Sequence, residues 1–160
     1  MRVLIISDTH RRDGNFTGVL EKEGSFDRMI HLGDAEGSHH FLSSLAGCPA
    51  DFVRGNCDIF GDLPMEKDIM LGKYRVLLTH GHGYRVSSDL ARLGSEARMR
   101  GFDIVMFGHT HRPVIGERYG VKLINPGSLS YPRQEDPVPS YIVMDIDENG
   151  GAEFEIRYLG

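Results

Sequence analysis

The chain has little cysteine and no long apolar run. Its 160 residues include only Cys48 and Cys57, which are too few for a disulfide scaffold, so we expect both thiols to be reduced. No apolar segment approaches the roughly 20 residues that a transmembrane helix needs. Residues 1–6 form too short an apolar segment for a signal peptide and fit a strand instead. These absences predict a cytoplasmic protein with no membrane partner.

Basic residues are also in the minority. The 18 Lys and Arg against 23 Asp and Glu give a formal net charge of −5. An acidic balance makes a nucleic acid polymer an unlikely partner, because such partners are held by basic surfaces. A small phosphate ester bound through metals is not excluded, since bound cations are often the largest local charges in a site. The length predicts one domain, residues 1–160.

The first half of the chain alternates strand and helix patterns. Strands are predicted at 2–7, 28–32 and 51–54, and helices at about 16–22 and 36–45. We expect Phe41, Leu42 and Leu45 to form the buried face of the second helix, which Gly47 and Pro49 should end.

The second half is rich in β patterns. We predict hairpins at 66–71 with 74–79, at 114–118 with 121–125, and at 141–146 with 153–158. A helix is predicted at about 88–100 and a proline-rich surface loop at 132–139. Two stacked sheets with helices outside would explain this mixture, so the fold class is α/β.

Five polar motifs directly follow β-rich segments. In chain order they are Ser7-Asp8-Thr9-His10, Gly33-Asp34, Gly55-Asn56-Cys57-Asp58, His80-Gly81-His82 and Gly108-His109-Thr110-His111. In an open α/β sheet the carboxyl ends of the strands face one crevice, where ligands collect. We therefore expect the five turns to converge at one point.

The residue types in these motifs suit metal ions. Mixed oxygen and nitrogen ligands favour divalent Mn, Fe, Ni or Zn. Asp8 and His10 lie two residues apart in an extended turn, so both side chains can point to one ion. The two oxygens of Asp34 allow this carboxylate to bridge two ions. The motifs together predict a dinuclear metal site.

The order of the motifs, with Asn125-Pro126-Gly127-Ser128 after them, resembles the calcineurin-like metallophosphoesterases. The most similar branch is the small single-domain YfcE-type phosphodiesterases, and Vps29 is a distant likeness. The resemblance implies a four-layer α/β/β/α sandwich of two mixed sheets flanked by helices. It implies two divalent metal ions, with Mn preferred. The implied ligands of one ion are Asp8, His10, Asp34 and His111, and those of the other are Asp34, Asn56, His80 and His109.

The implied activity is hydrolysis of small phosphate esters, with diesters preferred, by a metal-bridging hydroxide. Asp34, Asn56, Cys57 and Asp58 are the candidate catalytic residues, and Asp58 is expected to orient its neighbour. Many relatives carry His where this chain has Cys57. Because a thiol is a weak proton donor, this difference predicts modest turnover. The alternative is a Vps29-like interaction scaffold with a vestigial metal site, and a homo-oligomer stays open.

Several other polar residues have two interpretations. His82 is as compatible with a substrate contact as with a plain turn residue. Arg12 is a candidate phosphate contact, but exposed arginines such as Arg11 and Arg12 are common. His31 lies within a predicted strand and is expected in the core, whereas His39 and His40 are expected at the surface.

Overall fold

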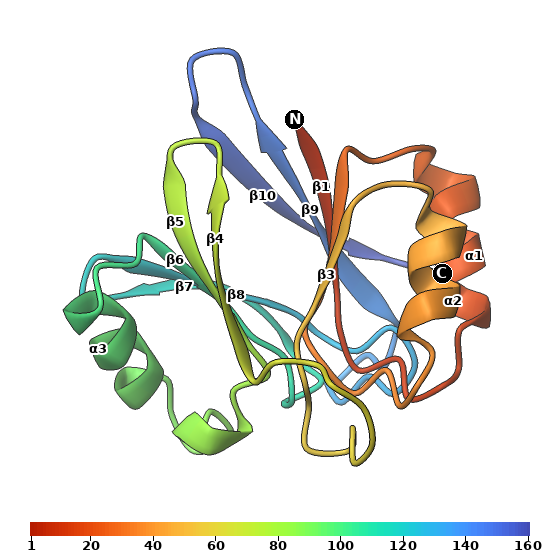
Figure 1. Cartoon of the computed structure of the whole chain (residues 1–160), viewed down its shortest axis with the longest axis horizontal. Coiled ribbons are helices and arrows are strands. Elements are labelled where there is room, and N and C mark those ends of the chain that lie inside the picture. Colours follow the sequence, from red (N-terminus) through yellow and green to blue (C-terminus); the bar gives the residue numbers. More distant parts are fainter.

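Two five-stranded sheets packed face to face form the centre of the molecule (Figure 1). The computed structural model describes residues 1–160. The first sheet has the order β10-β9-β1-β2-β3 and the second has the order β4-β5-β6-β8-β7. The strands are β1 (Arg2–Ile6), β2 (Arg28–His31), β3 (Ala50–Phe52), β4 (Glu66–Leu71), β5 (Tyr74–Thr79), β6 (Ile104–Met106), β7 (Pro113–Arg118), β8 (Val121–Pro126), β9 (Ser140–Ile146) and β10 (Ala152–Tyr158).

Helices cover the outer faces of both sheets. Helices α1 (Gly14–Glu23) and α2 (His39–Ala46) lie outside the first sheet, and α3 (Ala91–Met99) lies outside the second (Figure 1). Both sheets are mixed: β1, β2 and β3 are parallel, as are β5, β6 and β8. In the first sheet β9 is antiparallel to both of its neighbours, β1 and β10, and in the second sheet β4 and β7 are antiparallel to β5 and β8. The predicted sandwich of two mixed sheets between helices is confirmed.

Strand β1 is buried on both faces, which explains its uninterrupted apolar sequence. Val3 and Ile5 belong to the core between the two sheets. Leu4 and Ile6 point the other way and belong to the core beneath α1 and α2. A third cluster lies between the second sheet and α3. The first strand therefore joins two cores, and the residues that follow it are held firmly.

The three predicted hairpins are confirmed, with bounds that match to within one residue. Helix α2 differs from its prediction. It begins at His39 because Glu36 and Gly37 adopt the left-handed conformation, with φ of 53° and 93°. Its predicted apolar face is wrong, since only Leu42 is buried, whereas Phe41 and Leu45 are 57% and 38% exposed. Gly47 ends the helix in the left-handed conformation, as predicted.

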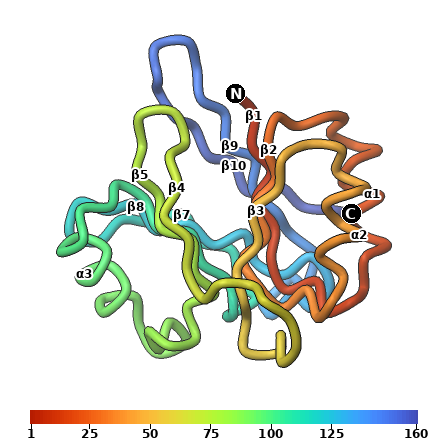
Figure 2. The backbone as a smooth tube through the Cα atoms, viewed as in Figure 1, coloured from red at the N-terminus to blue at the C-terminus, as the bar shows by residue number.

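The parallel strands place the polar motifs at one end of the molecule. Figure 2 shows the segments that follow β1, β2, β3 and β5 gathered at the lower end of the view. The short helix η1 (His82–Tyr84) follows β5 there. None of the helices has the length and the apolar character needed to cross a bilayer.

Candidate metal centre

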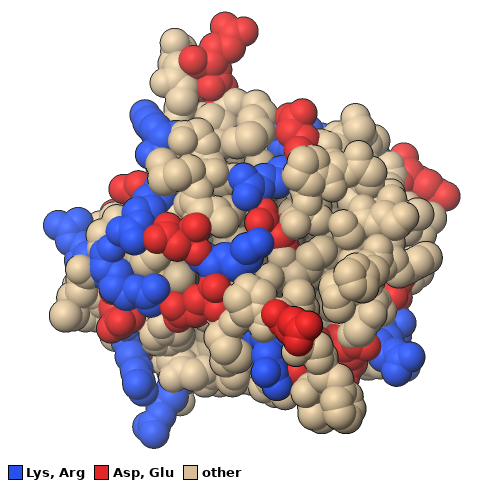
Figure 3. Space-filling model, in the orientation of Figure 1, with Lys and Arg blue, Asp and Glu red and all other residues tan.

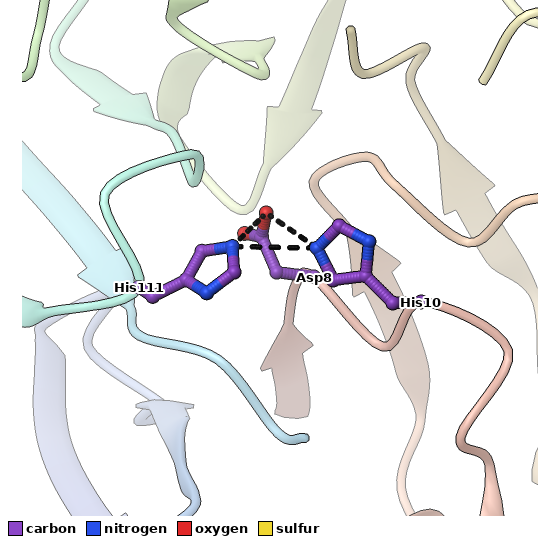
Figure 4. A group of neighbouring side chains, drawn as sticks. All are labelled: Asp8, His10 and His111. Carbon is purple, nitrogen blue, oxygen red and sulfur yellow. Dashed lines mark hydrogen bonds and ion pairs between the residues drawn. The ribbon is translucent and has the colours of Figure 1, made fainter. Parts of the chain in front are cut away.

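The structure brings the seven predicted ligand residues together at the carboxyl ends of the parallel strands. Asp8 and His10 follow β1, and His111 follows β6. Asp8 Oδ1 lies 3.1 Å from His111 Nε2 and 3.7 Å from His10 Nε2 (Figure 4). The two imidazole Nε2 atoms are 3.3 Å apart. One carboxylate and two imidazoles therefore point at a common centre.

A second group of donors adjoins the first. His80 Nε2 lies 3.2 Å from Asp34 Oδ2 and 3.0 Å from Asn56 Oδ1. His109 Nδ1 lies 3.1 Å from the same Asn56 oxygen. Asp34 Oδ2 is also 3.8 Å from His10 Nε2, in the first group. Asp34 thus stands between the two groups, where a bridging carboxylate would have to be. The assignment of the seven residues as ligands stays a prediction.

Backbone carbonyls fix which nitrogen two of the imidazoles present. His80 Nδ1 is 2.6 Å from the Leu32 carbonyl oxygen, and His111 Nδ1 is 2.7 Å from that of Tyr131. Because a carbonyl oxygen only accepts hydrogen bonds, each Nδ1 carries a proton and donates it. A neutral ring then presents the lone pair of Nε2 to the cluster, as in metal-binding histidines.

The hydrogen-bond acceptors of the cluster outnumber the hydrogen-bond donors that the protein supplies to them. Asp8 Oδ1 is buried and has no hydrogen-bond donor, which is costly for a carboxylate oxygen. Burial alone would lower the pKa of His80, but hydrogen bonding to Asp34 and the charges of Asp8 and Asp34 raise it. The carboxylates thus attract a positive charge to this point. Oxygen and imidazole donors around an unpaired carboxylate oxygen fit divalent metal ions.

The backbone at the cluster is strained. Five of the predicted ligands have left-handed φ angles, namely Asp8 (55°), His10 (46°), Asp34 (61°), His109 (70°) and His111 (58°). Residues other than glycine seldom adopt this conformation, and such strain gathers at functional sites. It re-aims the side chains after each strand so that they converge.

Two glycines allow the turns to approach closely. A Cβ atom on Gly55 would lie 2.0 Å from Asp34 Oδ1, and one on Gly108 would lie 2.1 Å from Ser7 Oγ. Both distances are far below any van der Waals contact. Gly55, before Asn56, and Gly108, before His109, are therefore required because any side chain there would clash with the neighbouring turn.

The side chains of the third motif support the cluster in different ways. The buried Asp58 carboxylate accepts hydrogen bonds from three backbone N–H groups, those of Asp34, Gly55 and Glu36, each at 2.7 Å. The Cys57 N–H donates to Asp34 Oδ1 at 2.8 Å. Burial and the nearby carboxylates of Asp34 and Glu36 raise the pKa of the Cys57 thiol to about 11. The thiol is therefore neutral at pH 7 and is a poor nucleophile.

The remaining sequence candidates lie around the cluster. The half-buried His82 ring is centred 5.5 Å from that of His80 and 6.1 Å from that of His109. Arg12 is exposed, and its guanidinium lies 4.5 Å from the centre of the Tyr131 ring. His31 is fully buried with its Nε2 3.0 Å from Thr9 Oγ1, so its predicted core position is confirmed.

Three residues of the site were missed by the sequence interpretation. Glu36 Oε2 lies 3.3 Å from His10 Nδ1, and Tyr131 and Arg133 line a cleft beside His10 and His111. The nearness of Glu36 to Asp34 and of Tyr131 to Ser128 in the sequence was the only available signal. Ser128 itself donates to the Asp8 carbonyl oxygen at 2.8 Å, which ties the predicted Asn-Pro-Gly-Ser turn to the site.

Comparison with known proteins identifies the family. Residues 1–149 match the model of the calcineurin-like phosphoesterase superfamily domain, and the chain belongs to this superfamily. It is 34% identical over 152 residues to the probable metallophosphoesterase YsnB of Bacillus subtilis, covering 93% of this chain and 86% of that protein. Membership implies phosphoesterase activity, divalent metal ions and a small-molecule substrate.

Solved structures show the same fold. Vps29 of Entamoeba histolytica complexed with zinc has a TM-score of 0.77 and 24% identity, with 100% of each chain covered. The phosphoesterase YfcE of E. coli has a TM-score of 0.69 and 23% identity, again over 100% of each chain. An archaeal phosphodiesterase has a TM-score of 0.70 and 22% identity, covering 98% of this chain and 100% of that one.

Proposed function

We propose that this protein is a dinuclear metal-dependent phosphodiesterase. The observation that carries the proposal is the convergence of seven oxygen and nitrogen donors in two adjoining groups, the first of which contains the unpaired, buried Asp8 oxygen. The proposal includes manganese as the preferred metal, a single domain over residues 1–160 and a cytoplasmic location. The preference for diesters is supported by the archaeal phosphodiesterase of the same fold.

The donor groups suggest how two ions would be shared. Asp8, His10 and His111 would hold one ion, Asn56, His80 and His109 would hold the other, and Asp34 would contact both. Bound divalent ions at such a site supply positive charge for the phosphate oxygens and make a water molecule more acidic.

The residues of the chain position these groups for the reaction. The Leu32 and Tyr131 carbonyl oxygens orient His80 and His111. Asp58 holds the backbone on both sides of the site by accepting from Asp34 and Gly55. Burial and the neighbouring Asp34 and Glu36 carboxylates raise the pKa of the Cys57 thiol, which disfavours a thiolate nucleophile and leaves metal-activated water as the attacking group. Cys57 also supplies no cation or strong proton donor to the leaving group, so substrates with good leaving groups should react fastest.

Hydrolysis of two chromogenic esters tests the function. With Mn²⁺ at neutral pH, we expect a higher kcat/KM for bis(p-nitrophenyl) phosphate than for p-nitrophenyl phosphate, and loss of both activities with a chelator. A clear preference for the monoester would make the protein a phosphatase. Activity that survives complete metal removal, verified by elemental analysis, would disprove the metal mechanism.

An interaction scaffold is the second candidate, because apolar side chains are exposed near the site. Ile59 and Phe60, in the loop after Asp58, are 70% and 92% exposed. Figure 3 shows that the face over α2 and β3 carries few charged side chains. Large exposed apolar patches mark interaction sites. A metal-loaded protein that hydrolyses no phosphate ester would favour this second function.

A further inference from the structure

A cleft of about 510 Å³ opens beside the metal-ligand cluster. It is lined by His10, Glu36, His111, Tyr131, Pro132 and Arg133. His10 and His111 are two of the proposed ligands, so a group bound in this cleft would lie next to a phosphate held at the metals. The cleft is placed to receive one of the two alcohol portions of a diester.

Tyr131 gives this cleft an aromatic wall. Tyr131 as a whole residue is 39% exposed, and its ring meets the His10 ring edge to face, with the centroids 5.5 Å apart. Its main chain is fixed, because its N–H donates to Ser128 Oγ and its carbonyl oxygen accepts from His111 Nδ1, both at 2.7 Å. The phenolic hydroxyl forms no hydrogen bond within the protein. A half-exposed ring on a rigid main chain suits stacking by a planar base.

Two arginines beside Tyr131 have guanidinium groups without a hydrogen-bond or ion-pair partner in the protein. Arg12 lies 4.5 Å from the centre of the Tyr131 ring, and Arg133 lines the cleft. The main chains of both residues are held, since Ser130 Oγ donates to the Arg12 carbonyl oxygen and the Arg133 N–H donates to the His111 carbonyl oxygen. Neither guanidinium forms a hydrogen bond or an ion pair, although the chain has an excess of acidic residues. The one carboxylate in the cleft, that of Glu36, faces His10 Nδ1.

Guanidinium groups without hydrogen-bond partners, placed beside an aromatic ring, favour a ligand that has both a phosphate and a planar ring. Arginine binds phosphate with two parallel hydrogen bonds, which gives both strength and orientation. A planar base with a second phosphate, as in a nucleotide, satisfies the ring and the two cations at once. A long nucleic acid fits less well, because its affinity depends on an extended basic surface, and the chain has a net charge of −5.

We propose that the Tyr131 cleft binds a nucleotide portion of the substrate, with the base against Tyr131 and a second, non-reacting phosphate held by Arg12 and Arg133. The substrate class is then a short nucleotide diester that carries a terminal phosphate. This inference rests on the proposed phosphodiesterase function. The sequence indicated Arg12 only as a candidate phosphate contact, and its place against Tyr131 assigns it here to the second, non-reacting phosphate.

Two substrates that differ by one phosphate test the proposal. The Mn²⁺-loaded protein is assayed with adenylyl-adenosine and with the same dinucleotide carrying a 5′-phosphate. We expect the terminal phosphate to raise kcat/KM by about tenfold or more, as a charge-assisted hydrogen bond allows. In Arg133→Gln and in Arg12→Gln the ratio between the two substrates should fall toward one. Arg98→Gln, an exposed arginine on α3 with the same change of charge, should keep the wild-type ratio.

Two kinds of result would overturn the proposal. A wild-type ratio near one, or an undiminished ratio in both cleft variants, removes the phosphate site. Cleavage of bis(p-nitrophenyl) phosphate without cleavage of either dinucleotide removes the nucleotide class, while the phosphodiesterase function stands.

A binding measurement tests the nucleotide cleft independently of the proposed phosphodiesterase activity. Calorimetry on the metal-loaded protein compares adenosine 5′-monophosphate with adenosine 3′,5′-bisphosphate. We expect the bisphosphate to bind about tenfold more tightly, and this advantage should shrink in Arg133→Gln. Tyr131→Ala should weaken both nucleotides, and the smaller change Tyr131→Phe separates loss of the hydroxyl from loss of the ring. Equal affinities in the wild type would disprove the cleft assignment even if no ester is hydrolysed.

Discussion

The Asp58 carboxylate holds Asp34 through its backbone, because Asp58 Oδ2 accepts a hydrogen bond from the Asp34 N–H at 2.7 Å. The same oxygen accepts from the Gly55 N–H, also at 2.7 Å. One buried side chain thus ties the turn after β2 to the turn after β3. The left-handed Asp34, which stands between the two donor groups, depends on this contact for its orientation.

Asp58→Asn should weaken metal binding without removing a proposed ligand. An amide has one accepting oxygen and an NH₂ group that faces backbone donors, so at least one N–H loses its partner. We expect a loss of metal affinity of about 10–100-fold and a decrease of about 1–3 kcal/mol in the free energy of unfolding. Calorimetric titration with Mn²⁺ measures the first. Asp62→Asn, at an exposed position of the same loop, is the control, and equal affinities in both variants would contradict the role of Asp58.

Asp34→Ala should damage metal binding more than any other single ligand change. Asp34 Oδ2 approaches both His80 and His10, so its removal should weaken both ions. Elemental analysis of the wild type after saturation with Mn²⁺ should find about two ions per chain, the number that a two-metal site requires. His10→Ala should lose chiefly one of them. If Asp34→Ala retains two tight ions, Asp34 is not the bridge.

Cys57→His should accelerate the hydrolysis of esters with poor leaving groups. It would place an imidazole on a residue whose N–H already contacts Asp34. General acid catalysis typically contributes about 10²–10⁴-fold, so even an imperfect donor should raise kcat/KM measurably for alkyl or nucleoside esters. The gain should be smaller for p-nitrophenyl esters, because p-nitrophenolate needs little protonation. Cys57→Ala is the matched variant. If it abolishes activity while two metals stay bound, the thiol takes part in the reaction.

Gly55→Ala should distort the cluster. Its Cβ would lie 2.0 Å from Asp34 Oδ1 and 2.6 Å from the Asp34 nitrogen, so one of the two turns must move. We expect a loss of about 1–3 kcal/mol of stability, as for other overpacked sites, together with weaker metal binding. Gly116→Ala in β7 meets no atom closer than 3.7 Å and should change stability by no more than about 0.5 kcal/mol. Thermal denaturation of both variants measures the two losses of stability, and equal losses would contradict the steric role of Gly55.

Glu23, far from the metal cluster, should make stability depend on pH. Burial alone would raise the pKa of Glu23, but hydrogen bonds from Tyr141 and Arg2 and the charge of Arg157 lower it. A carboxylate whose pKa is lower in the folded state stabilises the fold above its unfolded pKa, here near 4.5, and this contribution is lost as the pH falls through the folded pKa.

Glu23→Gln should therefore reduce the free energy of unfolding at pH 7 by about 1–2 kcal/mol, in line with charged hydrogen bonds. The difference from wild type should narrow as the pH is lowered below 4.5. Glu21→Gln, an exposed change on the same helix, should show no such dependence. Urea denaturation at several pH values provides the measurement, and a difference that is constant with pH would contradict the assignment.

The sequence by itself determined most of the strands and helices and which residue types gather at the candidate site. Alternating apolar residues and two-residue turns such as Gly72-Lys73 are local signals, so the hairpins could be predicted. The Asp, Asn and His residues that follow successive strands could also be identified, because each lies next to its strand in the sequence. The start of α2 was missed because the left-handed Glu36 is held by a hydrogen bond from its N–H to Asp58, 22 positions away.

Only the tertiary structure decided how these residues are used. His80 Nδ1 contacts the Leu32 carbonyl oxygen across 48 positions of the chain, and His111 Nδ1 contacts that of Tyr131 across 20. The cleft beside the cluster likewise forms only because the fold brings Tyr131 and Arg133 next to His10, more than 100 positions earlier in the chain. Such contacts depend on how the two sheets bring distant turns together. Residue types fix which groups can bind a metal or a phosphate, whereas packing fixes which atom of each group faces the site.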